Sequence, residues 1–120
     1  MDKTSPTVGK NLYLAEQFQS VEAYMKEHLC DMIGLDDISH GCSMSVSKLS
    51  TLFRQYKGCS PMAHFNYLRI EEAKRLIETT SMNMTEISDK LGFGSSQYFS
   101  KVFKKNAGVT PTEYAKNAAL

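Results

Sequence analysis

Two segments of this 120-residue chain gather side chains that can bind anions or hydrogen-bonding groups. Residues 45–58 and residues 95–108 contain basic and hydroxyl side chains but no acidic ones. Their cations are Lys48, Arg54 and Lys57 in the first segment and Lys101, Lys104 and Lys105 in the second. Ammonium and guanidinium groups bind phosphates, and hydroxyl or amide groups hydrogen-bond to polar edges. We therefore expect binding chemistry in these two segments.

The charge of the chain is unevenly distributed, although its formal net charge is only +1. Residues 1–44 carry three basic and seven acidic side chains, whereas residues 45–120 carry eleven basic and six acidic ones. A basic surface confined to one part of a chain is typical of nucleic-acid binding. A merely solvated basic face would explain either segment alone, but the same bias in both favours a shared partner.

The two basic segments belong to an internal repeat. With a shift of 50 residues, corresponding apolar, glycine and proline positions match: Leu49, Leu52, Phe53, Gly58 and Pro61 with Phe99, Val102, Phe103, Gly108 and Pro111. Just upstream the shift is 49, and Ile38, Ser39 and Cys42 match Ile87, Ser88 and Leu91. The second copy therefore gains one residue near 92–94. Each copy predicts a short helix, a tight turn and a second helix, and two such units suit two evenly spaced targets on duplex DNA.

Apolar residues recur at helical spacing through most of the chain, and no segment shows the alternation of a strand. We predict an all-α fold of about seven helices, with two helix-turn-helix subdomains joined by a long central helix. Residues 1–14 are expected to be a linker or tag remnant and residues 15–120 the domain. Within it, the first unit is expected at about 15–59, the linker helix at about 60–80 and the second unit at about 81–116.

Helix ends are predicted by local signals. Ser45 and Ser95 are expected N-caps of the two basic helices, and Gly58 and Gly108 are expected to end them. Asn83 with Glu86, and Thr110 with Glu113, have capping-box spacing. In the linker helix, Glu71 and Arg75 are expected to form an i,i+4 ion pair.

No residue pattern supports catalysis, a cofactor or a membrane partner. The chain lacks a Gly-rich phosphate loop and a nucleophile–base pair, so we predict that it is not an enzyme and needs no cofactor. A zinc site assembled from two His-x-Cys pairs would match no common zinc motif, so we predict no metal. Cys42 and Cys59 align with apolar residues, which argues against the reactive cysteines of some DNA-repair proteins. No apolar run approaches the ~18 residues of a membrane span. The N-terminus has no signal-peptide pattern, so a cytoplasmic protein is expected.

The second half of the chain closely resembles the C-terminal signature of the AraC/XylS family of bacterial transcription regulators. The resemblance is carried by residues 86–88, 92–93, 98–105, 108–111 and 113–114, and by the central-helix pattern at residues 67–77. It covers about residues 18–116. It implies two helix-turn-helix units whose second helices enter adjacent major grooves of one double-stranded site, in a protein that acts at the bacterial nucleoid. It also implies the DNA-binding part of a longer regulator, which would dimerise through a missing domain, whereas this chain alone is expected to be monomeric.

Some residues depart from the family signature. Ser39 and Ser88 stand where the family often has alanine, and Gln97 stands where it usually has serine. Ala115 follows Tyr114 where arginine is common, which removes one possible phosphate contact. The first basic helix has no arginine before Arg54, so its unit is expected to contribute mainly phosphate contacts.

Side chains near the start of a recognition helix reach bases, and flanking groups hold the DNA backbone. We assign base reading to Ser47, Lys48, Ser50 and Thr51 in the first helix and to Ser96, Gln97, Ser100 and Lys101 in the second. Gln97 is the sharpest candidate, because its amide can pair with adenine N6 and N7. We assign phosphate contacts to Ser45, Arg54, Lys57, Ser95, Tyr98, Lys104 and Lys105.

The alternative interpretation is a helical protein-interaction module whose basic helices bind an acidic partner. Contact with RNA polymerase through the acidic residues Asp31, Asp36 and Asp37 could also accompany DNA binding. The tandem spacing favours DNA over this alternative.

Overall fold

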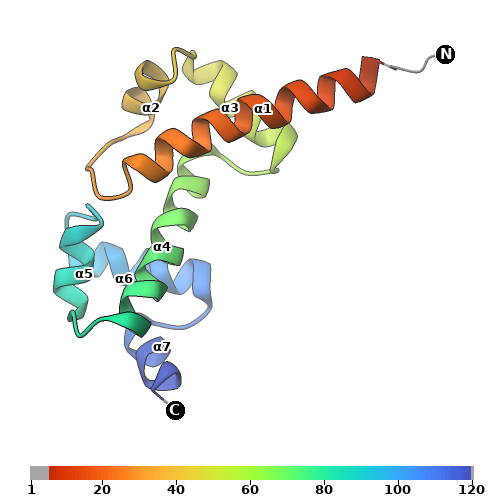
Figure 1. Cartoon of the computed structure of the whole chain (residues 1–120). Coiled ribbons are helices and arrows are strands. Elements are labelled where there is room, and N and C mark those ends of the chain that lie inside the picture. Colours follow the sequence, from red (N-terminus) through yellow and green to blue (C-terminus); the bar gives the residue numbers. More distant parts are fainter. Residues whose placement is uncertain (1–5, 120) are drawn as a thin grey trace. The chain divides into compact units, whose positions relative to one another are not determined.

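The computed structural model describes residues 6–119, with side chains from residue 11 onward, and this part of the chain forms seven α-helices (Figure 1). They are α1 (Pro6–Glu27), α2 (Leu35–Gly41), α3 (Val46–Tyr56), α4 (Pro61–Thr79), α5 (Met84–Lys90), α6 (Ser96–Ala107) and α7 (Pro111–Ala118). No strand occurs between residues 6 and 119, so the expected all-α fold is confirmed. None of these helices is long and apolar enough to span a membrane.

The chain divides into two compact units. The first contains α1, α2, α3 and the start of α4 as far as His64. The second contains residues 29–32, the rest of α4, and helices α5, α6 and α7. The predicted linker helix is therefore α4, and most of it belongs to the second unit.

The core of the first unit forms where α1 packs against α2 and α3. Its buried apolar residues are Phe18, Val21, Met25, Ile38, Leu49, Leu52 and Phe53. The rings of Phe18 and Phe53 lie 4.9 Å apart between centroids. His64, at the start of α4, is also buried here, and its Nε2 lies 2.8 Å from a Glu22 carboxylate oxygen. These contacts hold α3 with its polar face outward.

The core of the second unit is built on α4, α5 and α6. It consists of Ile70, Ala73, Leu76, Ile87, Leu91, Phe93, Phe99, Val102 and Phe103. Complete burial of a side chain of this size contributes about 1.5–3 kcal/mol relative to exposure. Burial of these residues therefore holds α6 against α4 and α5.

The helix α1 begins earlier than the sequence pattern indicated. The expected linker covered residues 1–14, but α1 begins at Pro6; residues 1–5 lie outside the described part. Leu12 and Tyr13 are 62% and 55% exposed, so these two apolar residues do not form part of a buried helical face.

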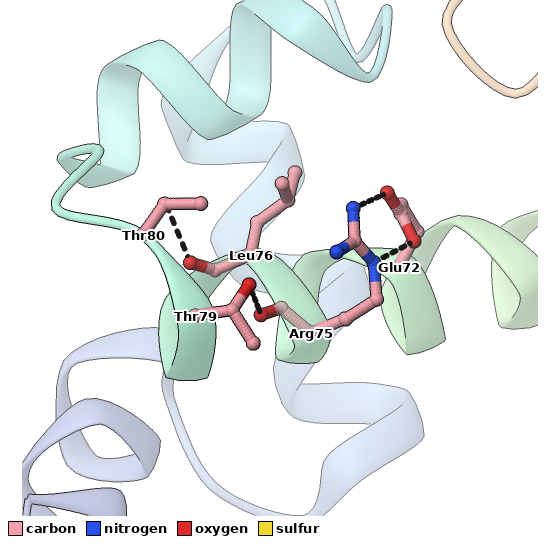
Figure 2. A network of polar contacts seen from close by, with 5 residues as sticks. All are labelled: Glu72, Arg75, Leu76, Thr79 and Thr80. Carbon is pink, nitrogen blue, oxygen red and sulfur yellow. Dashed lines mark hydrogen bonds and ion pairs between the residues drawn. The ribbon is translucent and has the colours of Figure 1, made fainter.

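The ion pairs on α4 differ from the expected one (Figure 2). Arg75 donates from Nε and Nη2 to the two carboxylate oxygens of Glu72, at 2.8 and 2.7 Å. Glu71 pairs with Lys74 at 2.9 Å instead of with Arg75. Residues three and four apart are both neighbours on a helix, and here the i,i+3 pairs form. The hydrogen bond from Arg75 lowers the pKa of Glu72.

Two threonine hydroxyls bond back to the backbone at the end of α4. Thr79 and Thr80 donate their hydroxyls to the carbonyls of Arg75 and Leu76, both at 2.6 Å (Figure 2). Both are bonds from a hydroxyl to the carbonyl four residues earlier, and the Leu76 carbonyl also accepts the backbone N–H of Thr80 at 3.0 Å.

Candidate nucleic-acid interface

The first basic helix, α3, begins and ends as predicted. The Ser45 hydroxyl oxygen accepts the backbone N–H of Lys48 at 3.1 Å, which is N-cap geometry. The inner face of the helix buries Leu49, Leu52 and Phe53. After Lys57 the chain turns at Gly58, which has a φ of 74° that glycine adopts without strain.

The residues assigned to base reading on α3 lie on its outer side. Ser47, Lys48 and Thr51 are exposed, and Ser50 is half-buried. The expected phosphate-binding residues Arg54 and Lys57 are exposed as well. The Lys57 ammonium also lies 5.6 Å from the centre of the Phe18 ring, which orients it by a cation–π contact.

A groove of about 420 Å³ lies beside this face. Its α3 side includes Ser47, Lys48, Thr51 and Gln55, and its α1 side includes Leu14 and Gln17. Sequence reasoning missed both Gln17 of α1 and Gln55 of α3 as residues that line this groove. Gln17 is about thirty residues from α3 along the chain, so no local pattern could have indicated its position.

The second basic helix, α6, has the same design. The Ser95 hydroxyl oxygen accepts the backbone N–H of Tyr98 at 3.1 Å. Phe99, Val102 and Phe103 are buried. Gly108 caps the end of α6 with a φ of 81° and donates its N–H to the Lys104 carbonyl at 2.8 Å.

The residues assigned to DNA contact on α6 also lie on its outer side. Ser96, Gln97 and Lys101 are exposed and Ser100 is half-buried. Lys104 and Lys105 are exposed further along the helix. Tyr98 is 47% exposed, and its ring lies 6.0 Å from that of Phe93, so it is partly packed and partly accessible.

The two helices therefore present matching faces. Ser50 and Ser100, which correspond in the repeat, are both half-buried at the edge of the core. Thr51 and Arg54 correspond to Lys101 and Lys104, and all four are exposed. The structure thus places each set of assigned residues together on one helical face of its own unit.

The turns before α3 and α6 are each held by a serine hydroxyl. Ser39 donates its hydroxyl to the Met44 carbonyl at 2.5 Å, and Ser88 donates to the Ser95 carbonyl at 3.0 Å. Each serine ties the first helix of its unit to the start of the basic helix. The two carbonyls are not equivalent, since Met44 precedes the N-cap Ser45, whereas Ser95 is itself an N-cap.

A buried arginine lies under the second turn. Arg69, on α4, is 5% exposed. Its Nε and Nη2 donate to the Leu91 carbonyl at 2.8 and 2.6 Å. Burial lowers the pKa of its guanidinium, yet arginine stays protonated in proteins at neutral pH. Arg69 was not among the residues assigned from the sequence.

The last helix is attached to α4 by a tyrosine. Thr110 and Glu113 form the expected capping box at the start of α7. The Tyr114 hydroxyl donates to the Glu78 carboxylate, and this hydrogen bond is the main reason that the pKa of Tyr114 is raised to about 12.

The cysteines do not form a site in the described residues. Cys30 is exposed, and Cys42 and Cys59 are partly buried. Burial raises the pKa of the Cys42 thiol, which disfavours its reactive thiolate form. Between residues 6 and 119, no group of three or more His, Cys, Asp or Glu side chains could hold a metal ion.

Comparison with known proteins agrees with this geometry. A family model described as a helix-turn-helix domain matches residues 38–117. The arabinose operon regulatory protein of Escherichia coli K12 is 37% identical over 92 residues, which cover 76% of this chain and 32% of that protein. The chain belongs to the AraC/XylS family. It is a DNA-binding domain of a transcription regulator and not an enzyme.

Other AraC/XylS relatives agree. The raffinose operon transcriptional regulatory protein RafR of Pediococcus pentosaceus is 31% identical over 105 residues, which cover 88% of this chain and 38% of that protein. The chain spans about a third of the length of the curated relatives it matches.

Solved structures of the family share the fold. An AraC-type transcriptional regulator from Chromobacterium violaceum superimposes with a TM-score of 0.80 at 27% identity, over 88% of this chain and 94% of that one. The DNA-binding domain of the global transcriptional factor AdpA, solved with a target DNA, gives a TM-score of 0.76 at 27% identity, over 87% of this chain and 90% of that one.

Proposed function

We propose that this domain reads a double-stranded operator with both units, by placing α3 and α6 in adjacent major grooves of one duplex. The observation that carries the proposal is the matched exposure of the two helices, each with buried apolar residues on one face and polar and basic residues on the other. An α-helix fits the major groove, where every base pair presents a distinct hydrogen-bonding pattern. The target DNA bound by the related AdpA domain supports the same partner here.

Base reading in this proposal belongs to the first two turns of each of the two helices. Lys48 and Lys101 donate to guanine O6 and N7, and Gln97 pairs with adenine N6 and N7. The hydroxyl groups serve donors or acceptors, and they are Ser47, Ser50, Thr51, Ser96 and Ser100. The second unit supplies more of the specificity, since the first offers mainly hydroxyls.

Phosphate binding belongs to the residues that flank these turns. The cations are Arg54, Lys57, Lys104 and Lys105, and the hydroxyl donors are Ser45, Ser95 and Tyr98. Four cations that neutralise phosphates would give a slope of log K against log salt of roughly −4.

Selection from a random duplex library at about 100 mM salt tests the proposal, since phosphate contacts hold at this ionic strength and non-specific binding weakens. The selected duplex is then titrated against scrambled DNA. We expect an asymmetric site with two base clusters about 10 base pairs apart, one helical turn. A single enriched cluster would show that one unit only anchors. No enrichment and no binding would refute DNA reading and direct the search to a protein partner, which pull-down without DNA would detect.

A further inference from the structure

The carbonyl that Arg69 binds belongs to the C-cap of α5. Leu91 is that C-cap, and helix ends leave backbone carbonyls without intrahelical partners. Arg69 supplies two N–H donors to this one oxygen, from Nε at 2.8 Å and Nη2 at 2.6 Å. The Arg69 side chain therefore fixes the point where α5 gives way to the turn.

The guanidinium is itself held from several sides. Its central carbon lies 4.0 Å from the centre of the Phe93 ring and 5.0 Å from that of Phe65. Its Nη1 donates to the Asn66 side chain at 3.3 Å. Arginine suits such a position because its planar group stacks on aromatic rings while its edge donates hydrogen bonds. Phe93 lies inside the turn. The guanidinium of Arg69 therefore holds this segment at two points, the Leu91 carbonyl and the Phe93 ring.

The turn needs external support because glycines make it adaptable. Gly92 and Gly94 have φ angles of 71° and 84°, which glycine adopts easily and leaves easily. Between them and α6 stands only Ser95, the N-cap. A Cβ atom at Gly92 would lie 3.1 Å from the Asp31 backbone and 3.4 Å from Arg69 Nη2, so the turn is closely packed. The position of the turn decides where the first residues of α6 point.

We infer that Arg69 is a positioning residue for DNA reading, which fixes the base-contacting end of α6 from the opposite side of the turn. The inference rests on the proposed function. With 5% of its surface exposed, Arg69 cannot serve as a phosphate contact, although it is a cation. Its effect on DNA passes through Leu91 and Phe93 to α6. Loss of its hydrogen bonds should therefore weaken discrimination between bases in the cluster that α6 reads, which we call the second cluster. The number of phosphate contacts should stay the same.

The test compares Arg69→Met, Arg69→Lys and Arg75→Met with the unchanged chain on the selected duplex. Methionine keeps the packing volume but donates no hydrogen bond, and lysine keeps the charge without the planar fork. Arg75 is the matched control, because it lies on the same helix but its side chain is exposed and pairs only with Glu72 in the described residues. Circular dichroism defines the unfolding midpoint of each variant, and binding is measured well below it.

The expected result separates the two clusters. For Arg69→Met, base changes in the second cluster, which cost roughly tenfold or more in the unchanged chain, should cost about twofold. First-cluster discrimination and the salt slope should stay the same, and Arg69→Lys should be intermediate. The double variant with Gln97→Ala should be no worse than the worse single variant, whereas the double variant with Thr51→Ala should be additive.

Other outcomes overturn the inference. If Arg69→Met discriminates between bases in the second cluster as well as the unchanged chain does, Arg69 does not position α6. The same conclusion follows if discrimination falls equally in both clusters. If Arg69→Met does not fold, the same comparison is decided by Arg69→Lys against Arg75→Met. A chain that selects a two-cluster site but fails this test refutes only the role of Arg69. A chain that selects no site refutes the proposed function itself.

Discussion

Ser43 and Gly92 occupy the same position of the repeat and share a left-handed backbone conformation. Their φ angles are 54° and 71°, and each follows the C-cap of the first helix of its unit. The two turns therefore begin in the same way, although only the second has glycine there. A side chain in this region costs about 1–2 kcal/mol relative to right-handed backbone.

Opposite substitutions at these two positions should have opposite effects. Ser43→Gly should raise the free energy of unfolding by up to about 1 kcal/mol, because relief of strain exceeds the added freedom of the unfolded chain. Gly92→Ala should lower it by more than about 1 kcal/mol, because the new Cβ is strained and meets the Asp31 backbone at 3.1 Å. Urea unfolding measures both. Equal destabilisation by the two changes would contradict the shared conformation.

Gln97→Ala should reduce specificity at one base position. We expect a loss of about 1–3 kcal/mol on the preferred duplex and little loss on duplexes with another base there, because the lost contact is with a base edge. Competition binding against single-base variants of the duplex gives the profile. Asn106→Ala is the matched control, because Asn106 is another exposed amide on α6 whose side chain donates to the Val102 carbonyl. A uniform loss across all duplexes would mean that Gln97 does not read a base.

Lys104→Ala should weaken binding to every duplex alike. A phosphate contact carries no sequence information, so its loss should not depend on the base sequence. Because one fewer phosphate is neutralised, the slope of log K against log salt should become less steep by about 1. Lys26→Ala serves as control, since it removes the same charge from α1, where the ammonium lies 3.7 Å from Glu22. Titrations at several salt concentrations give the slopes. Equal slope changes in both variants would assign the effect to net charge instead of to contact.

Tyr114 should make stability depend on pH in the alkaline range. Its pKa is raised to about 12 in the folded chain, mainly by the hydrogen bond to Glu78, against about 10 for an ordinary tyrosine. The hydrogen bond needs the protonated phenol. Its contribution is therefore complete below about pH 10 and is lost as the pH rises through about 12.

Unfolding by urea, followed from about pH 9 to about pH 12, should show this loss as a narrowing difference between the unchanged chain and Tyr114→Phe. The two proteins differ only at residue 114, so the effects of other groups cancel in the difference. In a pH titration followed by tyrosinate absorbance, the unchanged chain should show a component with a midpoint near pH 12 that is absent from Tyr114→Phe. A stability difference independent of pH would show that the Glu78 hydrogen bond is not made in solution.

Local features of the fold were predictable because their causes lie within a few residues. Ser45, Ser95, Asn83 and Thr110 each cap a helix as expected, since an N-cap bonds to a backbone N–H two or three residues ahead. The exposed faces of α3 and α6 followed from apolar spacing. The DNA roles assigned to those faces stay predictions. The predicted ion pair between Glu71 and Arg75 was wrong, because i,i+3 and i,i+4 partners compete on one helical surface and the i,i+3 pairs form.

The sequence by itself determined the helices, their caps, the repeat and the family, since each depends on apolar spacing or on an ordered motif within a short stretch of the chain. The tertiary structure decided which distant groups meet. Arg69 meets the Leu91 carbonyl 22 residues away, and Tyr114 meets Glu78 across 36 residues. Both contacts depend on how helices pack around a core, and packing follows the fit of whole surfaces. A buried arginine and a surface arginine look alike in a sequence, and only the fold distinguishes Arg69 from Arg75.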